Sequence, residues 1–229
     1  MIVPNFQFGR YLLAGLITLV SVPAEADLIV NGDFSAGATG FSSDYTLVPG
    51  GAGRFTLPGD IGITSDPSNG SSSGFTNSYL SFGNHTTGSG QMLLVDGDGS
   101  SLDIWSESVS LAADTTYTFS YYATSPDGDT LSGSNIADLE ILVNGTAQSD
   151  TLITSQGGSP SWQLVSTDFK TGAAGSYAFS IKDLNSAAYD NDVAIDDIQL
   201  VAPEPASWAL IVPGLGFVGA VLRRRRQSV

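Results

Sequence analysis

Few residues in this sequence are suited to catalysis. His85 is the only histidine and the chain has no cysteine, so one imidazole base and no thiol nucleophile are available. The run Gly70-Ser71-Ser72-Ser73-Gly74 has the spelling of a nucleophile elbow, but its Ser-rich surroundings lack the strand-to-helix turn that exposes such a serine. We expect His85 to be a loop residue hydrogen-bonded to Thr86 or Thr87. Aspartates are numerous, yet nothing singles out the carboxylate pair that glycoside hydrolysis needs. The sequence therefore predicts a protein that is not an enzyme.

Aromatic side chains are the best candidates for ligand contacts. Sugar rings stack on Trp and Tyr while neighbouring polar groups fix their orientation, which draws attention to Trp105, Trp162, Tyr121 and Tyr122. Both tryptophans lie within strand-like patterns, where large aromatic residues usually belong to the core. Tyr121 and Tyr122 are adjacent, so strand alternation must send one of them outward.

The charge balance narrows the range of partners. Residues 27–202 contain 21 acidic residues against three basic ones, a formal charge of −18. Nucleic acids and anionic lipid surfaces are poor partners for such a surface, because both present phosphate and require positive charge. Strong self-repulsion keeps copies apart in solution, and calcium from the medium would offset part of it.

The N-terminus has the pattern of a secretory signal peptide over residues 1–26. Arg10 precedes an apolar run from Tyr11 to Val22, and Ala24-Glu25-Ala26 supplies small residues at the two positions that signal peptidase reads. A retained membrane helix is the alternative, but 12 apolar or small residues are too few to cross a bilayer. We expect cleavage by signal peptidase and a mature chain that begins at Asp27.

The C-terminus, residues 203–229, has three parts in order. Pro203-Glu204-Pro205 comes first, the uncharged run Ser207 to Leu222 follows, and four arginines, Arg223, Arg224, Arg225 and Arg226, stand near the end. As a helix, those 16 uncharged residues would span about 24 Å, short of a hydrocarbon core of roughly 30 Å. Arginines hold a chain end in the cytoplasm, so we expect a provisional transmembrane anchor with everything before Pro203 on the other side.

These terminal residues closely resemble the PEP-CTERM sorting signal of Gram-negative bacteria, which combines the same triplet, hydrophobic segment and basic tail. The resemblance implies recognition by an exosortase, a membrane-embedded cysteine transpeptidase, with cleavage near Pro203-Glu204-Pro205. It also implies an inner-membrane intermediate, followed by delivery to the cell surface or extracellular matrix. An ordinary tail anchor with a proline-rich approach is the alternative.

Between the two signals, residues 27–202 have the period-two alternation of β-strands. Thr116 to Tyr121 alternates polar and aromatic residues, and the dipeptides Asp96-Gly97, Asp127-Gly128 and Asn144-Gly145 supply the positive φ angles of tight hairpin turns. The expected strands are 28–30, 91–95, 102–111, 116–121, 137–143, 162–169, 176–181 and 193–201. We see no helical pattern of useful length, so the sequence predicts one all-β domain, an antiparallel sandwich.

An Asn31-Gly32-Asp33-Phe34 motif opens this domain and Ile195-Asp196-Asp197-Ile198 closes it. This order of motifs resembles the galactose-binding-like jelly rolls of carbohydrate-binding modules. In such modules these motifs lie side by side and commonly frame a structural calcium, which implies Asp33 and Asp196 as metal ligands. Ser35 stands where the family often has an acidic residue, and this removes one strong oxygen ligand.

Asp196 is notable for its expected position. It shares a strand face with Ala194, Ile198 and Leu200, so we expect it to point inward, where a lone carboxylate needs a cation or hydrogen bonds. A pair of aspartates that only cap turns is the alternative for Asp33 and Asp196.

Taken together, these patterns predict an exported, exosortase-sorted surface or matrix protein with a non-catalytic jelly-roll β-sandwich. A carbohydrate-binding module that holds extracellular polysaccharide is the first alternative, and a secreted hydrolase is the second. An exposed aromatic row would favour the former. A histidine dyad or a close carboxylate pair in a cleft would favour the latter.

Overall fold

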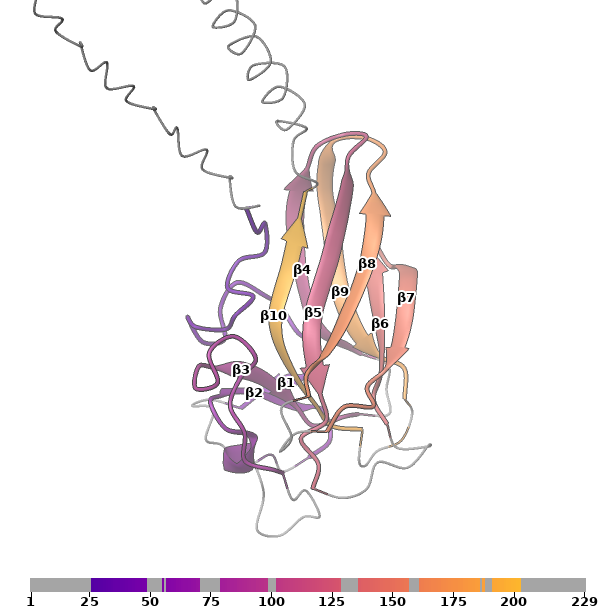
Figure 1. Cartoon of the computed structure of the whole chain (residues 1–229). Coiled ribbons are helices and arrows are strands. Elements are labelled where there is room, and N and C mark those ends of the chain that lie inside the picture. Colours follow the sequence, from indigo (N-terminus) through magenta and orange to yellow (C-terminus); the bar gives the residue numbers. More distant parts are fainter. Residues whose placement is uncertain are drawn as a thin grey trace, which may run out of the picture.

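The chain folds into two facing β-sheets (Figure 1). The computed structural model describes residues 26–48, 55, 57–70, 79–98, 102–128, 136–156, 161–185, 187 and 191–202. The expected signal peptide, apart from Ala26, and the expected triplet, transmembrane segment and arginine tail lie outside these residues. Within the described ranges, no helix is both long and apolar enough to cross a membrane.

Among the described residues, ten strands make up the two sheets, and one short 3-10 turn lies outside them. The six-stranded sheet has the order β1-β2-β3-β10-β5-β8, and the four-stranded sheet has the order β4-β9-β6-β7. The strand bounds are β1 Thr46–Leu47, β2 Asp60–Thr64, β3 Met92–Val95, β4 Asp103–Leu111, β5 Thr116–Thr124, β6 Asp138–Val143, β7 Thr146–Leu152, β8 Gln163–Lys170, β9 Gly175–Asp183 and β10 Val193–Val201, with the 3-10 turn η1 at Pro67–Gly70. Every pair of neighbouring strands is antiparallel except β1 with β2. The expected all-β sandwich is confirmed.

The main core fills the space between the two sheets. Alternate residues of β5 point into it, so that Tyr117, Phe119 and Tyr121 are buried. Trp105 of β4 lies 5.9 Å from Phe119, measured between ring centroids, and is 1% exposed. Removal of this apolar surface from water, at about 25 cal/mol per Å², stabilises the sandwich without disulfides.

A second, smaller cluster covers the opposite face of the six-stranded sheet. We call it the outer-face cluster; it consists of Phe55, Tyr79, Met92, Leu94 and Ala194. Its residues come from the segment before and within β3, together with β10. In Figure 1, β2 and β3 lie beside the lower part of β10. The six-stranded sheet is therefore apolar on both faces in this region.

A bulge divides β10 into two halves with opposite side-chain alternation. The pairing with β5 shifts between Asp196 and Gln199, and Asp197 has a φ of +52°, which non-glycine residues rarely adopt. Ile195 before the bulge and Ile198 after it both belong to the main core. Asp196 is buried, as expected, but it shares its face with Ala194 and not with Ile198 or Leu200, because the bulge inserts an extra residue.

The observed strands follow most of the expected ones. Strand β10 occupies the expected residues, and Asn144 and Gly145 form the β6–β7 turn with φ values of +50° and +72°. Residues 28–30 form no strand, and β1, β2 and β7 were not expected. Asp96-Gly97 is not a hairpin turn, since β3 and β4 belong to different sheets.

Candidate functional site: an aromatic platform beside the β10 bulge

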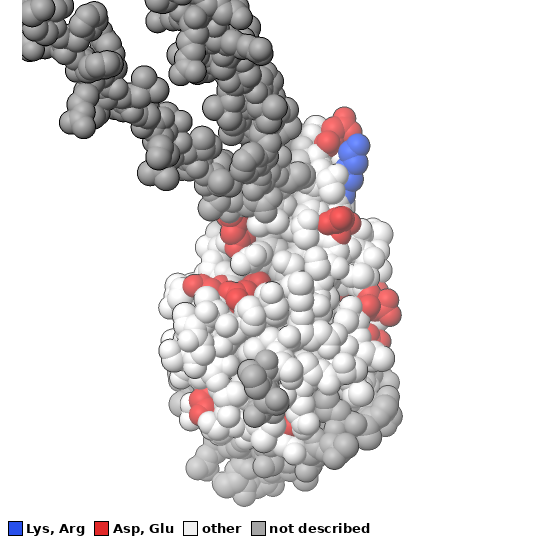
Figure 2. Space-filling view, in the orientation of Figure 1, with Lys and Arg blue, Asp and Glu red and all other residues white. Residues whose placement is uncertain are grey.

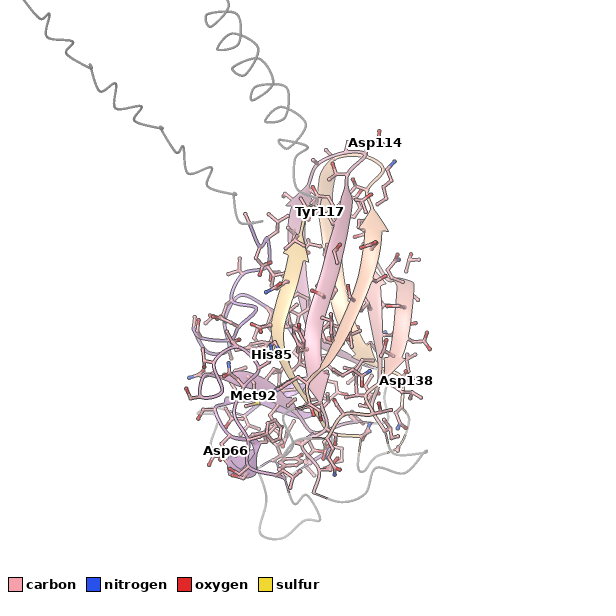
Figure 3. All side chains as sticks on the ribbon, viewed as in Figure 1. Asp66, His85, Met92, Asp114, Tyr117 and Asp138 are labelled. Carbon is pink, nitrogen blue, oxygen red and sulfur yellow. The ribbon has the colours of Figure 1, made fainter. Side chains whose placement is uncertain are left out.

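Four rings from three parts of the chain gather on the outer face of the six-stranded sheet. We call Phe82, His85, Tyr122 and Trp162 the aromatic platform. The His85 ring stacks on Tyr122 with centroids 3.5 Å apart and an interplanar angle of 13°. Trp162 meets His85 and Phe82 edge to face, at centroid distances of 6.0 and 5.9 Å. All four side chains are partly exposed, and Figure 3 shows His85 next to β10.

The loop that carries Phe82 and His85 is built around one buried asparagine. The Asn84 side-chain oxygen accepts hydrogen bonds from the backbone N–H groups of Thr87 and Gly90 and from the Thr87 hydroxyl, at 2.8–3.3 Å. Gly83 packs on the backbone of Gly88 so closely that a Cβ at Gly83 would overlap it. This close packing leaves no room for a side chain at Gly83.

Two consecutive carboxylates at the bulge hold this loop on the sheet. Oδ2 of Asp196 accepts hydrogen bonds from Asn84 Nδ2 and from both the backbone N–H and the hydroxyl of Thr86, at 3.0–3.1 Å. Asp197 lies 2.7 Å from Nδ1 of His85 and 2.6 Å from the Thr86 hydroxyl. The bulge places both carboxylates beside the loop. His85 thus pairs with Asp197, not with Thr86 or Thr87 as expected.

The platform continues along the same sheet face, first with an apolar side chain and then with polar ones. Leu164 of β8 pairs in register with Tyr122 and is 54% exposed. One step along the strands, Ser120 pairs with both Ser166 and Gln199. Beyond them, the Thr118 hydroxyl donates to Asp168 Oδ1 at 2.8 Å. An apolar end therefore continues into rows of hydroxyl, amide and carboxylate groups.

The structure separates the four aromatic candidates into two pairs. Tyr122 and Trp162 lie on the platform, whereas Trp105 and Tyr121 belong to the main core and offer no surface to a ligand. The adjacent tyrosines diverge because β5 alternates between its two faces. Burial raises the pKa of the Tyr121 phenol, as do the charges of Asp138 and Asp183.

Asp33 and Asp196 are held by different partners. The opening and closing motifs lie side by side, since the Ile198 N–H donates to the Gly32 carbonyl at 3.0 Å. Asp33, however, accepts from the backbone and hydroxyl of Ser35 in an exposed turn. Oδ1 of Asp196 is buried without a hydrogen-bond partner, and burial raises the pKa of this carboxyl to about 6 although Thr86 donates to it.

A bound cation would give Oδ1 of Asp196 the partner that it lacks, but few other ligand groups lie around this atom. Across the described ranges, no three acidic or histidine side chains are grouped to hold a metal ion. Calcium ions usually take six to eight oxygen ligands, so Asp33 and Asp196 would need backbone carbonyls and water to complete a site. The calcium site stays a prediction.

Sequence reasoning missed His85 and Phe82 as platform residues. His85 is 112 positions away from its partner Asp197, and Phe82 belongs to a loop without periodicity. The strand pattern carries no signal for either contact. The only available signal was the rarity of histidine in this chain.

Several solved structures resemble this fold. A Stig cyclase from Fischerella sp. TAU is 11% identical over 79% of this chain and 98% of its own, with a TM-score of 0.53. The CBM22-1 xylan-binding domain from Paenibacillus barcinonensis is 16% identical over 80% of this chain and 97% of its own, with a TM-score of 0.45. A family 16 carbohydrate-binding module is 18% identical over 76% and 99%, with a TM-score of 0.43. Such low identities concern the fold alone, and a fold does not fix a function.

No curated protein matches the sequence significantly. One family model does match part of it. The family model that describes the PEP-CTERM protein-sorting motif matches residues 201–226, which include the Pro203-Glu204-Pro205 triplet and the four arginines. The chain therefore carries a PEP-CTERM protein-sorting motif at its C-terminal end.

Proposed function

We propose that this protein is exported, sorted by an exosortase to the cell surface or extracellular matrix of a Gram-negative bacterium, and binds extracellular polysaccharide there through its aromatic platform. Its sandwich domain takes part as a non-catalytic module. The sorting half of the proposal is supported by the motif at residues 201–226. Signal peptidase and an exosortase act on the chain as processing enzymes, and an inner-membrane intermediate precedes release.

The platform is the observation that carries the binding half. Tyr122, Trp162 and the exposed Leu164 offer an apolar surface, and Ser120, Ser166 and other polar groups lie one row away. Sugar recognition needs this combination, because the carbon-bound hydrogens of a sugar ring pack on aromatic rings while its hydroxyls need hydrogen-bond partners. The closely packed loop at residues 82–90 keeps the platform in place before a ligand arrives.

The same contacts argue against a hydrolase. His85 and Asp197 form a histidine dyad, but the nearby Thr86 hydroxyl donates to Asp196 and Asp197 and is not positioned as a nucleophile for His85 to activate. One carboxyl pair among the described residues, Asp96 with Asp192, is 5% and 2% exposed, so a substrate cannot reach it. General acid–base catalysis requires access to the reacting atoms.

Affinity electrophoresis in gels that contain polysaccharides tests the binding half. Leu164→Ala and Trp162→Ala should each reduce retardation, with about a tenfold weaker affinity for a loss of about 1.4 kcal/mol. Leu152→Ala is the matched control, because Leu152 is 53% exposed on the other sheet and should bind like the parent. An equal loss of retardation in Leu164→Ala and Leu152→Ala would contradict binding at the platform. Release of reducing sugar by the parent would favour a hydrolase.

A further inference from the structure

A strip of side chains follows the platform across β10, β5 and β8, on the same outer face of the six-stranded sheet. We call it the polar strip, and its two rows are Ser120 with Ser166 and Gln199, then Thr118 with Asp168 and Val201. Cross-strand partners point to the same face of a sheet, and all six side chains are at least partly exposed. A ligand that lies on the platform can therefore reach the strip.

The first row of the strip suits an uncharged sugar. Serine hydroxyls both donate and accept hydrogen bonds, and the amide of Gln199 has a donor end and an acceptor end. A sugar hydroxyl also donates and accepts, so Ser120, Ser166 and Gln199 can each pair with it in either sense. An ionised uronate, sulfate or phosphate group accepts only, and it uses half of this capacity.

Asp168 in the second row places a negative charge on the strip. The Thr118 hydroxyl donates to Asp168 Oδ1 at 2.8 Å, which orients the carboxylate toward β5. An ionised carboxylate accepts hydrogen bonds from a sugar hydroxyl but repels another anion. Asp197 adds a second carboxylate at the platform end, where its side chain is 14% exposed beside His85.

The two described lysines are each paired with an aspartate outside the polar strip. Lys170 is the last residue of β8, and its Nζ lies 3.6 Å from Asp114 Oδ1. Lys182 belongs to β9 of the other sheet and lies 3.6 Å from Asp103 Oδ1. Arg54 is the remaining basic residue of the domain and lies outside the described residues. With 21 acidic residues against these three, the field of the whole domain also repels an anionic chain.

We propose that the platform and the polar strip select uncharged polysaccharides over those that carry uronate, sulfate or phosphate groups, and that Asp168 is the residue that rejects an anionic substituent. This inference rests on the binding half of the proposed function. A ligand anion two strand residues from Asp168 is about 7 Å away, and at that distance one unit charge weakens the binding of another by about threefold in water.

Affinity electrophoresis of the full exported protein gives the first test. Arabinoxylan, mixed-linkage β-glucan and galactomannan are the uncharged probes, and alginate and polygalacturonate are the polyuronates. An uncharged probe should retard the protein, and neither polyuronate should. Retardation by a polyuronate would overturn the charge selectivity and leave polysaccharide binding intact. Retardation by none of these probes would contradict the proposed function itself.

Matched derivatives of one polysaccharide then test Asp168. An uncharged probe that retards the parent is carboxymethylated, or hydroxyethylated to add similar bulk without charge, and both products are titrated into the protein by calorimetry. At about 0.15 M salt the Debye length is about 8 Å, so distant charges are largely screened. The parent should bind the carboxymethyl form more weakly than the hydroxyethyl form. Asp168→Asn should narrow this gap by about twofold to threefold.

Asp150→Asn is the matched control, because it changes the net charge equally at an exposed site on β7 of the other sheet and should leave the gap unchanged. A parent that binds both derivatives equally would overturn the proposal whether or not Asp168→Asn folds. A gap that Asp168→Asn leaves unchanged would remove the role of Asp168. Equal narrowing in both variants would show that net charge, and not the polar strip, sets the preference.

Discussion

At the residue scale, His85 is the side chain with the most varied set of contacts on the platform. Its ring stacks on Tyr122 and packs edge to face with Trp162, and its Nδ1 lies 2.7 Å from Asp197 Oδ2. Its own side chain remains 31% exposed. One residue thus joins the loop, the bulge, strand β5 and the residue that precedes β8.

His85→Ala should destabilise the protein by about 1–2 kcal/mol, since it removes a ring stack and leaves Asp197 with one donor fewer. His85→Gln should recover part of this loss, because its amide can still donate to Asp197. Urea denaturation of the three proteins provides the measurement. A His85→Ala protein as stable as the parent would mean that the loop is held by Asp196 and the outer-face cluster alone.

Calcium at Asp33 and Asp196 gives a second prediction at this scale. A single site with free ion at about 100 times its dissociation constant adds about 2.7 kcal/mol of stability. Thermal unfolding with calcium and with a chelator should then give different midpoints, and Asp196→Asn should reduce the difference. Equal midpoints for the parent would rule the site out.

At the element scale, the β10 bulge depends on close contact with the opening motif. A Cβ on Gly32 would lie 1.9 Å from the carbonyl oxygen of Ile198, so backbone would have to move. The Ile198 N–H also donates to the Gly32 carbonyl. The first and last segments of the domain are therefore fitted to each other beside the bulge.

Gly32→Ala should cost about 2–3 kcal/mol, as overpacking against backbone does. Gly172→Ala is the matched control, because a methyl group added at Gly172 would meet nothing within 4 Å and the φ of this residue is not in the left-handed region. The denaturant midpoints of the two variants measure the difference in their stability. A Gly32→Ala protein no less stable than Gly172→Ala would show that the two segments separate freely.

Strands with clear alternation could be predicted from the sequence, whereas only Tyr122 and Trp162 of the candidate site could. β10 alternates regularly enough to fix its bounds, but its bulge is invisible because Asp196-Asp197 reads as an ordinary step of the pattern. β7 is mostly polar and partly exposed on both faces, so it has no apolar period to detect. Tyr122 could be placed outward by alternation, but the His85 contact depends on loop geometry and long-range packing.

At the scale of the whole molecule, residues 27–202 are strongly acidic, and the sorting motif lies toward the C-terminal end of the sequence. Figure 2 shows acidic side chains scattered over the visible face and one small basic patch near its upper end. A formal charge of −18 for residues 27–202 favours solubility outside the cell. The sorting motif at residues 201–226 begins at the last residue of β10.

The central claim is that an exosortase reads the Pro203-Glu204-Pro205 triplet. Intact-mass measurement of the protein from fractionated cells tests it most directly, with the parent compared to a variant in which all three residues are alanine. The parent should give a shortened product outside the inner membrane. The variant should stay full-length in the inner membrane, because its apolar segment and its arginines are unchanged. A variant that is shortened and released like the parent would contradict the claim.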